Sequence, residues 1–225
     1  MGCTKKTIMA LIRKSNRYMG EAMKITFLEV RIIISSSLVL MGAVFAFINA
    51  GPSIWFAVGM AFSWFGDMTM SQVKPICLWT KNRVVGGMAA FAAAHVFYLI
   101  GLFGGAAVAG INNSAAITAA AVIWCATMLF AWFFALRQSK EPFAIKSAGV
   151  VYITMVCVIA AMGIGITVYS VRLWPLALGG MLFLVSDVVV GLHDIGKRTI
   201  PYLEAVIWGT YAPAQFFLLL GAFMI

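Results

Sequence analysis

The chain is a series of long apolar stretches separated by short polar segments. Each stretch is close to the roughly 20 residues that an α-helix needs to cross the bilayer core. The apolar residues run continuously instead of alternating, which favours helices over strands. We therefore predict an all-α, polytopic transmembrane helix bundle with seven spans. The predicted spans cover about residues 32–50, 53–71, 84–107, 115–136, 147–169, 173–192 and 201–223.

Composition agrees with a membrane protein, since 63% of the residues are hydrophobic and 10% are charged. A soluble domain of this composition would lack the polar side chains to cover its surface. The net charge of +9 would suit a nucleic-acid partner, but the basic residues lie at the ends of the apolar stretches, where they indicate topology. We expect membrane lipids as partners and no nucleic acid, while protein partners remain unknown.

The basic residues are divided unequally between the two sides of the predicted bundle. With a cytoplasmic N-terminus, 15 of the 16 Lys and Arg residues lie on the cytoplasmic side and only Arg172 lies opposite. The positive-inside rule therefore predicts a cytoplasmic N-terminus and an external C-terminus. Residues 1–31 form a basic tail or an interfacial helix on anionic lipid, and residues 32–225 form the transmembrane domain. The expected location is the cytoplasmic membrane of a bacterium or the endoplasmic reticulum of a eukaryote.

Two acidic residues lie inside predicted spans, Asp67 in the second and Asp187 in the sixth. A carboxylate is costly in a bilayer, so by default it indicates a functional site. Both spans run toward the cytoplasm, and each acid lies roughly five residues, or about 7 Å, before the cytoplasmic end. The two acids are thus predicted at one depth, where they can share a site. A pairing of Asp67 with Lys74 that anchors the helix is an open alternative.

Small and polar residues share helix faces with the two acids. Gly59, Ser63 and Asp67 follow one another at i, i+4 and i+8, and Gly180 shares a face with Asp187. Small residues permit close helix packing, so these faces are expected to point into the bundle. Other polar side chains predicted to face inward are His95 and Tyr98 on the third span, and Glu204, Tyr211 and Gln215 on the seventh.

Several classes of hydrolase are disfavoured by the residues present. The chain has two histidines, His95 and His193, whereas a zinc hydrolase needs about three protein ligands. Its four cysteines form no Cys-x-x-Cys motif, and there is no Gly-x-Ser-x-Gly elbow of a serine lipase. We therefore expect no metal and no cofactor. Glu204 is expected to form an ion pair with Lys197 or Arg198.

Four blocks, taken in order, resemble the YhhN-like family of lysoplasmalogenase-type membrane proteins. They are residues 62–67, 94–98, 179–187 and 211–215, and the resemblance extends over about residues 32–225. It implies an ether hydrolase of lipid metabolism that cleaves the vinyl ether bond of lysoplasmalogens. The products would be a fatty aldehyde and glycerophosphocholine or glycerophosphoethanolamine. Members of the family usually have eight spans, and here the basic N-terminal segment takes the place of the first.

The chemistry of vinyl ether cleavage suits two carboxyl groups. Protonation of the β-carbon leaves an oxocarbenium ion that water captures, and glycosidases handle such a cation with one protonated and one ionised carboxyl group. We therefore expect Asp67 and Asp187 to be the catalytic pair, without knowing which is the acid. Lys74 or Arg83 would hold the phosphate. The side chains expected to orient water or the lysophospholipid substrate are Ser63, His95, Tyr98, Ser186, Tyr211 and Gln215.

Two other functions stay open. The same acids can serve as the relay of a proton-coupled transporter. A non-catalytic protein that binds lysolipid is the second alternative. Transport without product formation would favour the first, and tight binding without turnover would favour the second.

Overall fold

The computed structural model describes residues 5–108, 110 and 114–225, and the side chains of residues 5–26, 108 and 115 are not part of that description. Within the described residues the chain forms seven α-helices and no strands, so the all-α prediction is confirmed. The helices are α1 (Lys5–Ile48), α2 (Pro52–Met70), α3 (Arg83–Val108), α4 (Ser114–Ala131), α5 (Phe143–Tyr169), α6 (Trp174–Asp194) and α7 (Leu203–Met224). The short elements are η1 (Ile76–Trp79), the π-helical η2 (Trp132–Leu136) that continues α4, and η3 (Val171–Leu173).

Six segments of the described chain are long and apolar enough to cross a membrane, and they correspond to every predicted span except the second. The chain is therefore a multi-pass membrane protein. The predicted second span, residues 53–71, does form helix α2 but lies outside that set. Its 19 residues include Ser53, Ser63 and Asp67, which lower the apolarity of a short helix. These three side chains are buried against neighbouring helices.

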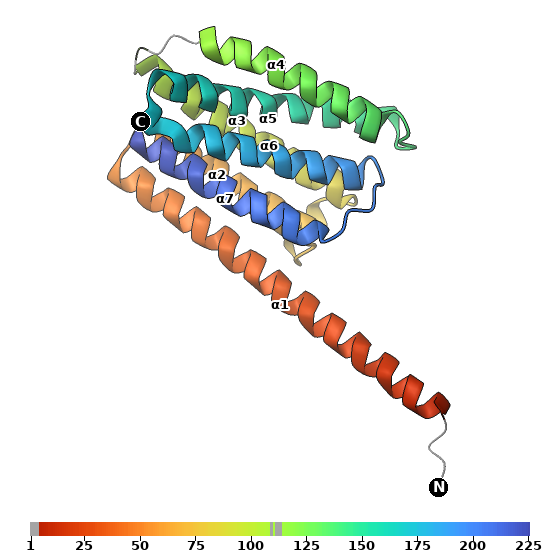
Figure 1. Cartoon of the computed structure of the whole chain (residues 1–225). Helices are drawn as coiled ribbons and strands as arrows, with labels where there is room; N and C mark the ends of the chain where they lie inside the picture. The colour runs from red at the N-terminus through yellow and green to blue at the C-terminus, as the bar shows by residue number, and fades with distance from the viewer. Residues whose placement is uncertain (1–4, 109, 111–113) are drawn as a thin grey trace.

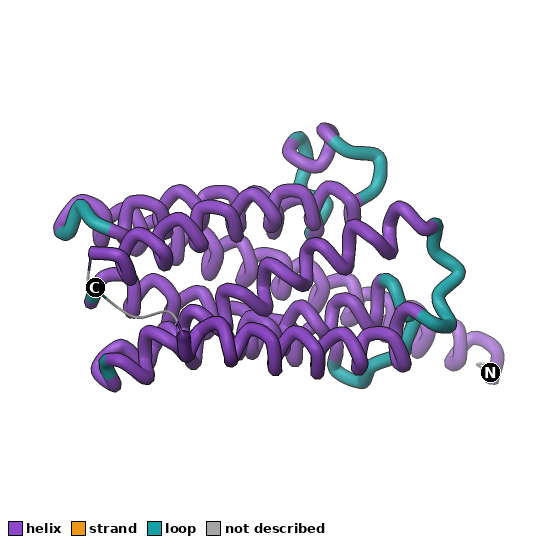
Figure 2. Tube along the Cα trace, turned by 90° about the horizontal axis from the view of Figure 1, so that it is seen from above, coloured by secondary structure: helices purple, strands orange, loops and turns teal. Residues whose placement is uncertain are grey.

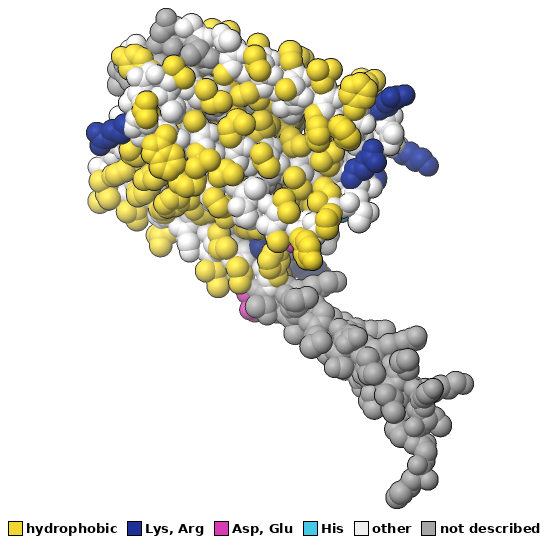
Figure 3. Space-filling model, in the orientation of Figure 1, with side chains coloured by type: hydrophobic (Ala, Val, Ile, Leu, Met, Phe, Trp, Pro, Cys, Tyr) yellow, Lys and Arg dark blue, Asp and Glu magenta, His cyan; other side chains and the backbone are white. Residues whose placement is uncertain are grey.

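The seven helices lie side by side in one bundle (Figure 1, Figure 2). Helix α2 packs mainly against α1 and α3, and α6 packs between α5 and α7. Helices α1 and α4 lie at opposite edges of the bundle (Figure 1). The visible face of the bundle is largely hydrophobic, and its Lys and Arg side chains gather toward the two ends (Figure 3), as expected for a surface that faces lipid.

Helix α1 crosses the predicted boundary between the basic segment and the first span without a break. It runs from Lys5 to Ile48, and its apolar part begins at Phe27. Its first half extends beyond the rest of the bundle (Figure 1). The helix places Arg31 and Ser35, one turn apart, at the point where α1 meets the bundle. Whether the first half of α1 rests on lipid stays a prediction.

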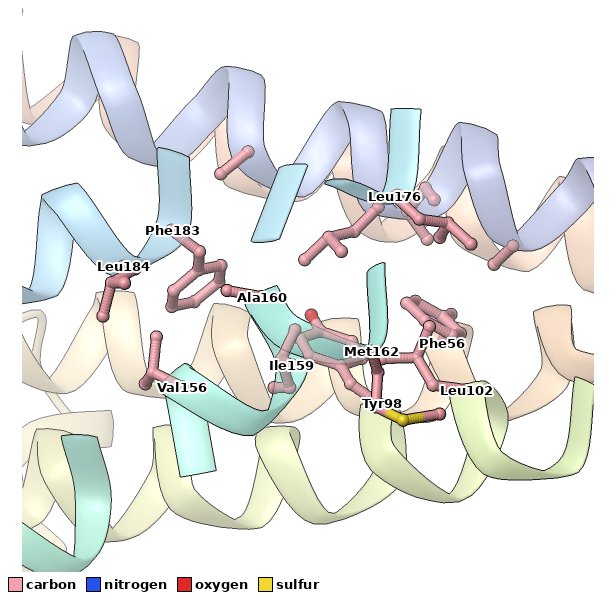
Figure 4. Packing of buried hydrophobic residues seen from close by; sticks show 14 of the residues in the cluster. Phe56, Tyr98, Leu102, Val156, Ile159, Ala160, Met162, Leu176, Phe183 and Leu184 are labelled. Atoms are coloured by element: carbon pink, nitrogen blue, oxygen red, sulfur yellow. The ribbon is translucent and has the colours of Figure 1, made fainter. Parts of the chain in front are cut away.

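Two adjacent glycines hold α6 against both of its neighbours. A Cβ atom on Gly180 would lie 2.7 Å from the Cα atom of Ala160 in α5, and one on Gly179 would lie 2.8 Å from the backbone nitrogen of Leu218 in α7. Only glycine permits backbones this close. Phe183, one turn further along α6, belongs to the buried core that these contacts create (Figure 4). The same packing fixes the depth and direction of the next turn of α6, which carries Asp187.

Candidate functional site

A cavity of about 200 Å³ opens at the end of the bundle where α2 and α6 finish and α3 and α7 begin. Asp67 and Asp187 both line it. The lining continues to Arg83 and Glu204 at the helix ends, whose side chains are 47% and 56% exposed. The cavity therefore joins the two intramembrane acids to the surface. By the distribution of basic loops, this is the end predicted to face the cytoplasm.

Asp67 is held by side chains from two other helices. Its Oδ2 atom accepts hydrogen bonds from the Ser35 hydroxyl at 2.6 Å and from the Tyr211 hydroxyl at 3.0 Å. The Arg31 guanidinium lies close enough to interact with it electrostatically. Lys74, the alternative partner, is exposed and does not line the cavity. The environment of Asp67 therefore comes from α1 and α7, not from the loop that follows α2.

Asp187 is partly buried and lines the same cavity. Its Oδ2 atom accepts one hydrogen bond, 2.8 Å long, from the hydroxyl of Tyr152 in α5. Asp187 also lies close enough to Asp67 for the two carboxyl groups to interact electrostatically. The structure thus brings both acids to one cavity and gives each a tyrosine hydroxyl as a hydrogen-bond donor. Their catalytic role stays a prediction.

Three other predicted residues form a closed hydrogen-bonded triangle outside the cavity lining. The hydroxyl groups of Ser63 and Tyr98 lie 3.1 Å apart, and Tyr98 donates to the Gln215 amide oxygen at 2.8 Å. The Gln215 amide nitrogen completes the triangle by donating to Ser63 at 3.1 Å. All three side chains are fully buried, and none lines the cavity. This geometry ties α2, α3 and α7 together beside the cavity and does not present these groups to a ligand inside it.

His95 is fully buried among aromatic rings and also lies outside the cavity lining. Its ring meets Phe183 and Tyr152 nearly edge to face, with centroids 4.9 Å and 5.1 Å away. Among the described residues neither ring nitrogen has a partner that meets hydrogen-bond geometry, although the Phe91 carbonyl one turn earlier is near enough to act on the ring. Ser186, in contrast, does line the cavity.

Several residues around the two acids were not predicted from the sequence. Ser35 and Tyr152 supply hydrogen bonds to the carboxyl groups, and Arg31 lies beside Asp67. A hydroxyl group in an otherwise apolar span was the available signal for the first two. The predicted pairing of Glu204 with Lys197 or Arg198 was wrong, because Glu204 forms its ion pair with Arg31 on α1. Lys197 pairs instead with Glu141 at 2.8 Å.

In the part of the chain that the structure describes, no group of three His, Cys, Asp or Glu side chains is arranged to hold a metal ion. Comparison with known proteins gave no significant match to a curated protein or to a solved structure. The sequence model of the YhhN family, however, matches residues 30–222. This range contains both acids, the hydrogen-bonded triangle and every residue that holds Asp67 in place. The chain belongs to the YhhN family.

Proposed function

We propose that the protein is a membrane hydrolase that cleaves the vinyl ether bond of lysoplasmalogens. The characterised members of the YhhN family are lysoplasmalogenases. The observation that carries the proposal for this chain is the meeting of Asp67 and Asp187, from different helices, in the wall of one cavity. Two carboxyl groups facing one enclosed space can act as a proton donor and an anionic partner.

The reaction consumes one water molecule. A protonated carboxyl group gives its proton to the β-carbon of the vinyl ether, which leaves the positive charge shared between the α-carbon and the ether oxygen. Water adds to the α-carbon while the second carboxylate takes a proton from it, and a hemiacetal results. In the last step the second carboxyl group gives this proton to the glycerol oxygen, which leaves as an alcohol. The first carboxyl group takes the proton of the hemiacetal hydroxyl, the fatty aldehyde forms, and both acids return to their starting states.

The surroundings of the two acids favour one assignment of these roles. Asp67 accepts two hydrogen bonds and has the Arg31 cation nearby, and both features stabilise an ionised carboxylate. Asp187 accepts one hydrogen bond, from Tyr152. We therefore assign Asp187 as the proton donor and Asp67 as the carboxylate that stabilises the cation and activates water. Both hydrogen bonds that the described side chains make to Asp67 go to Oδ2, and we assign Oδ1 to that water.

The cavity also suggests how the lysolipid lies. Its walls near the acids include apolar side chains such as Phe91, Met128 and Ile153, which suit an alkenyl chain. Two further charged residues of the lining, Arg83 and Glu204, lie at the open end. A lysolipid with its headgroup at the open end and its chain among the helices would present the vinyl ether between the two acids.

The test is aldehyde release by purified protein in detergent from lysoplasmenylcholine and lysoplasmenylethanolamine. Asp67→Asn and Asp187→Asn should each lower kcat by about 10²- to 10⁴-fold, the usual contribution of a general acid or base. Glu141→Gln is the matched control, because Glu141 pairs with Lys197 outside the cavity lining. It should stay within about twofold of the parent rate, as expected for a surface ion pair.

Three outcomes contradict the proposal. A wild-type rate of aldehyde release in either aspartate variant would contradict the two-carboxylate mechanism. Lysolipid binding without aldehyde release by folded protein would indicate a non-catalytic lipid-binding member. Proton-dependent movement of a solute into vesicles, again without product, would indicate a transporter that uses the same acids as a relay.

A further inference from the structure

Arg31 is a cation at the wall of the cavity with an unusual set of neighbours. Its side chain is 15% exposed and lines the cavity together with Asp67 and Trp208. The guanidinium carbon lies 4.5 Å from the centre of the Phe27 ring and 5.3 Å from that of Trp208. It also forms an ion pair with Glu204. The plane of the guanidinium is thus held by aromatic contacts, and its position does not depend on the ion pair alone.

The ion pair uses only part of the hydrogen-bonding capacity of Arg31. A guanidinium carries five N–H donors, and the contact with Glu204 is made through one Nη atom. The Nε atom is buried and has no hydrogen-bond partner among the described residues. A buried donor without a partner is costly, and a planar guanidinium that has donors beyond the one used by Glu204 is suited to a second anion with several oxygens.

We propose that Arg31 binds the phosphate group of the lysolipid substrate. This inference rests on the proposed function and names the residue that recognises the headgroup of the substrate. In a lysoplasmalogen only the three carbons of glycerol separate the vinyl ether oxygen from the phosphate ester. A cation that holds the phosphate must therefore lie close to the reacting carboxyl groups, and Arg31 lies within electrostatic reach of Asp67.

The other candidate cations meet this requirement less well. Lys74 is exposed and does not line the cavity. Arg83 lines the cavity at its open end, where its side chain is 47% exposed and lies 3.7 Å from Asp194. It can add long-range attraction for an anionic group that enters. Arg31 is the better desolvated of the two, so its contact with phosphate is less weakened by water.

Glu204 marks the direction from which the phosphate reaches Arg31. Its carboxylate approaches the guanidinium as a phosphate oxygen would, and its side chain lines the cavity. Because this side chain is 56% exposed, it can turn into water when the phosphate takes its place. The ion pair with Glu204 then keeps the largely buried Arg31 cation paired when the cavity holds no lipid.

The experiment measures binding without turnover. The probes are 1-O-hexadecyl-glycero-3-phosphocholine and 1-O-hexadecylglycerol, which are saturated ethers that differ in the phosphocholine group, and their Kd values are measured by calorimetry on purified protein in detergent. The wild type should bind the phospholipid more tightly. Arg31→Gln should reduce this preference by about 10- to 100-fold, the range for hydrogen bonds to a charged group. Arg31→Lys, which keeps the charge but loses the fork, should give an intermediate loss.

Arg137→Gln is the matched control, because Arg137 is an exposed arginine at the same end of the bundle and outside the cavity lining. It should keep the wild-type preference. The proposal is overturned if Arg31→Gln keeps the preference, or if it weakens both ligands equally, which would mean that Arg31 acts only on the fold or on Asp67. It is also overturned if Lys74→Gln removes the preference instead.

Two further measurements are needed. One distinguishes free phosphate from the phosphate of a lipid, and the other distinguishes phosphate binding by Arg31 from the proposed hydrolysis. If inorganic phosphate alone binds with the affinity of the phospholipid and loses it in Arg31→Gln, the site takes free phosphate and the lipid assignment fails. Because the probes have no vinyl ether, headgroup binding is measured independently of hydrolysis. The protein could release no aldehyde and still prefer the phospholipid in a way that depends on Arg31. That result would contradict the proposed hydrolase and support the phosphate site.

Discussion

The hydroxyl group of Tyr211 in α7 donates a 3.0 Å hydrogen bond to Asp67 in α2. The ring of Tyr211 is wedged between Phe91, Phe183 and Trp208, which meet it nearly edge to face. Its position is thus fixed by aromatic packing, and its hydroxyl group is directed at the carboxylate. This arrangement separates what the ring does for stability from what the hydroxyl does for Asp67.

Tyr211→Phe should keep the packing and remove the donor. If Asp67 works as a carboxylate, loss of one hydrogen bond to it should lower kcat by about 10-fold, corresponding to ~1.5 kcal/mol, while KM changes little. The exposed Tyr202 provides the control, and Tyr202→Phe should keep the parent rate. Aldehyde release at saturating lysolipid measures the effect. An unchanged kcat in Tyr211→Phe would mean that this hydrogen bond serves the fold only.

Tyr152 should be coupled to Asp187 in the same way. Its hydroxyl donates to Asp187 at 2.8 Å, so Tyr152→Phe should lower activity by about 10-fold in the parent protein. In the Asp187→Asn background the same change should cost little more, because the partner is already altered. The four rates form a double-mutant cycle. Additive losses in the double variant would show that Tyr152 acts through something other than Asp187.

Gly180→Ala should disturb the packing that positions Asp187. The added Cβ atom would lie 2.7 Å from the Cα atom of Ala160, so α6 and α5 must move apart. Overpacking of this kind costs about 1–3 kcal/mol, and we expect a lower Tm together with reduced activity. Gly209→Ala is the matched control in α7, because nothing lies within 4 Å of its added Cβ. It should keep or slightly raise Tm, since Ala favours helix over Gly.

The class of fold and the presence of both acids at one cavity could be predicted from the sequence for one physical reason, while the catalytic role of the acids stays a prediction. Apolar stretches of membrane-spanning length and carboxylates inside them are both strong local signals. The apolar signal is weaker in α2, where Asp67 and two serines bring a short helix below the apolarity of the six candidate spans. Polar residues that indicate a functional site inside a span therefore also lower the apolarity by which the span is recognised.

The partners of the acids could not be predicted, because they depend on how each helix is rotated against its neighbours. Tyr152 and Ser35 lie in apolar spans where a hydroxyl group is common, and neither is near its acid in sequence. Glu204 was assigned to nearby lysine and arginine residues, yet it pairs with Arg31, which is 173 positions away. Helix contacts of this range are set by packing, which a single sequence does not display.

His95 and Gln215 offer the last prediction, because they are both fully buried polar residues but differ in hydrogen bonding. Gln215 is paired with Tyr98 and Ser63, so Gln215→Leu should leave two buried hydroxyl groups short of a partner and cost about 1–3 kcal/mol. Neither ring nitrogen of His95 has a partner that meets hydrogen-bond geometry among the described residues, although the Phe91 carbonyl lies near the ring. His95→Phe therefore removes a buried polar group and loses at most this weak contact.

The two substitutions should consequently move Tm in opposite directions. His95→Phe keeps an aromatic ring beside Tyr152 and Phe183, and we expect an equal or higher Tm with activity maintained. Gln215→Leu should lower Tm. Thermal unfolding in detergent, followed by aldehyde release from the folded fraction, measures both effects. A loss of activity in His95→Phe at unchanged Tm would mean that the imidazole takes part in the reaction although it lies outside the cavity lining.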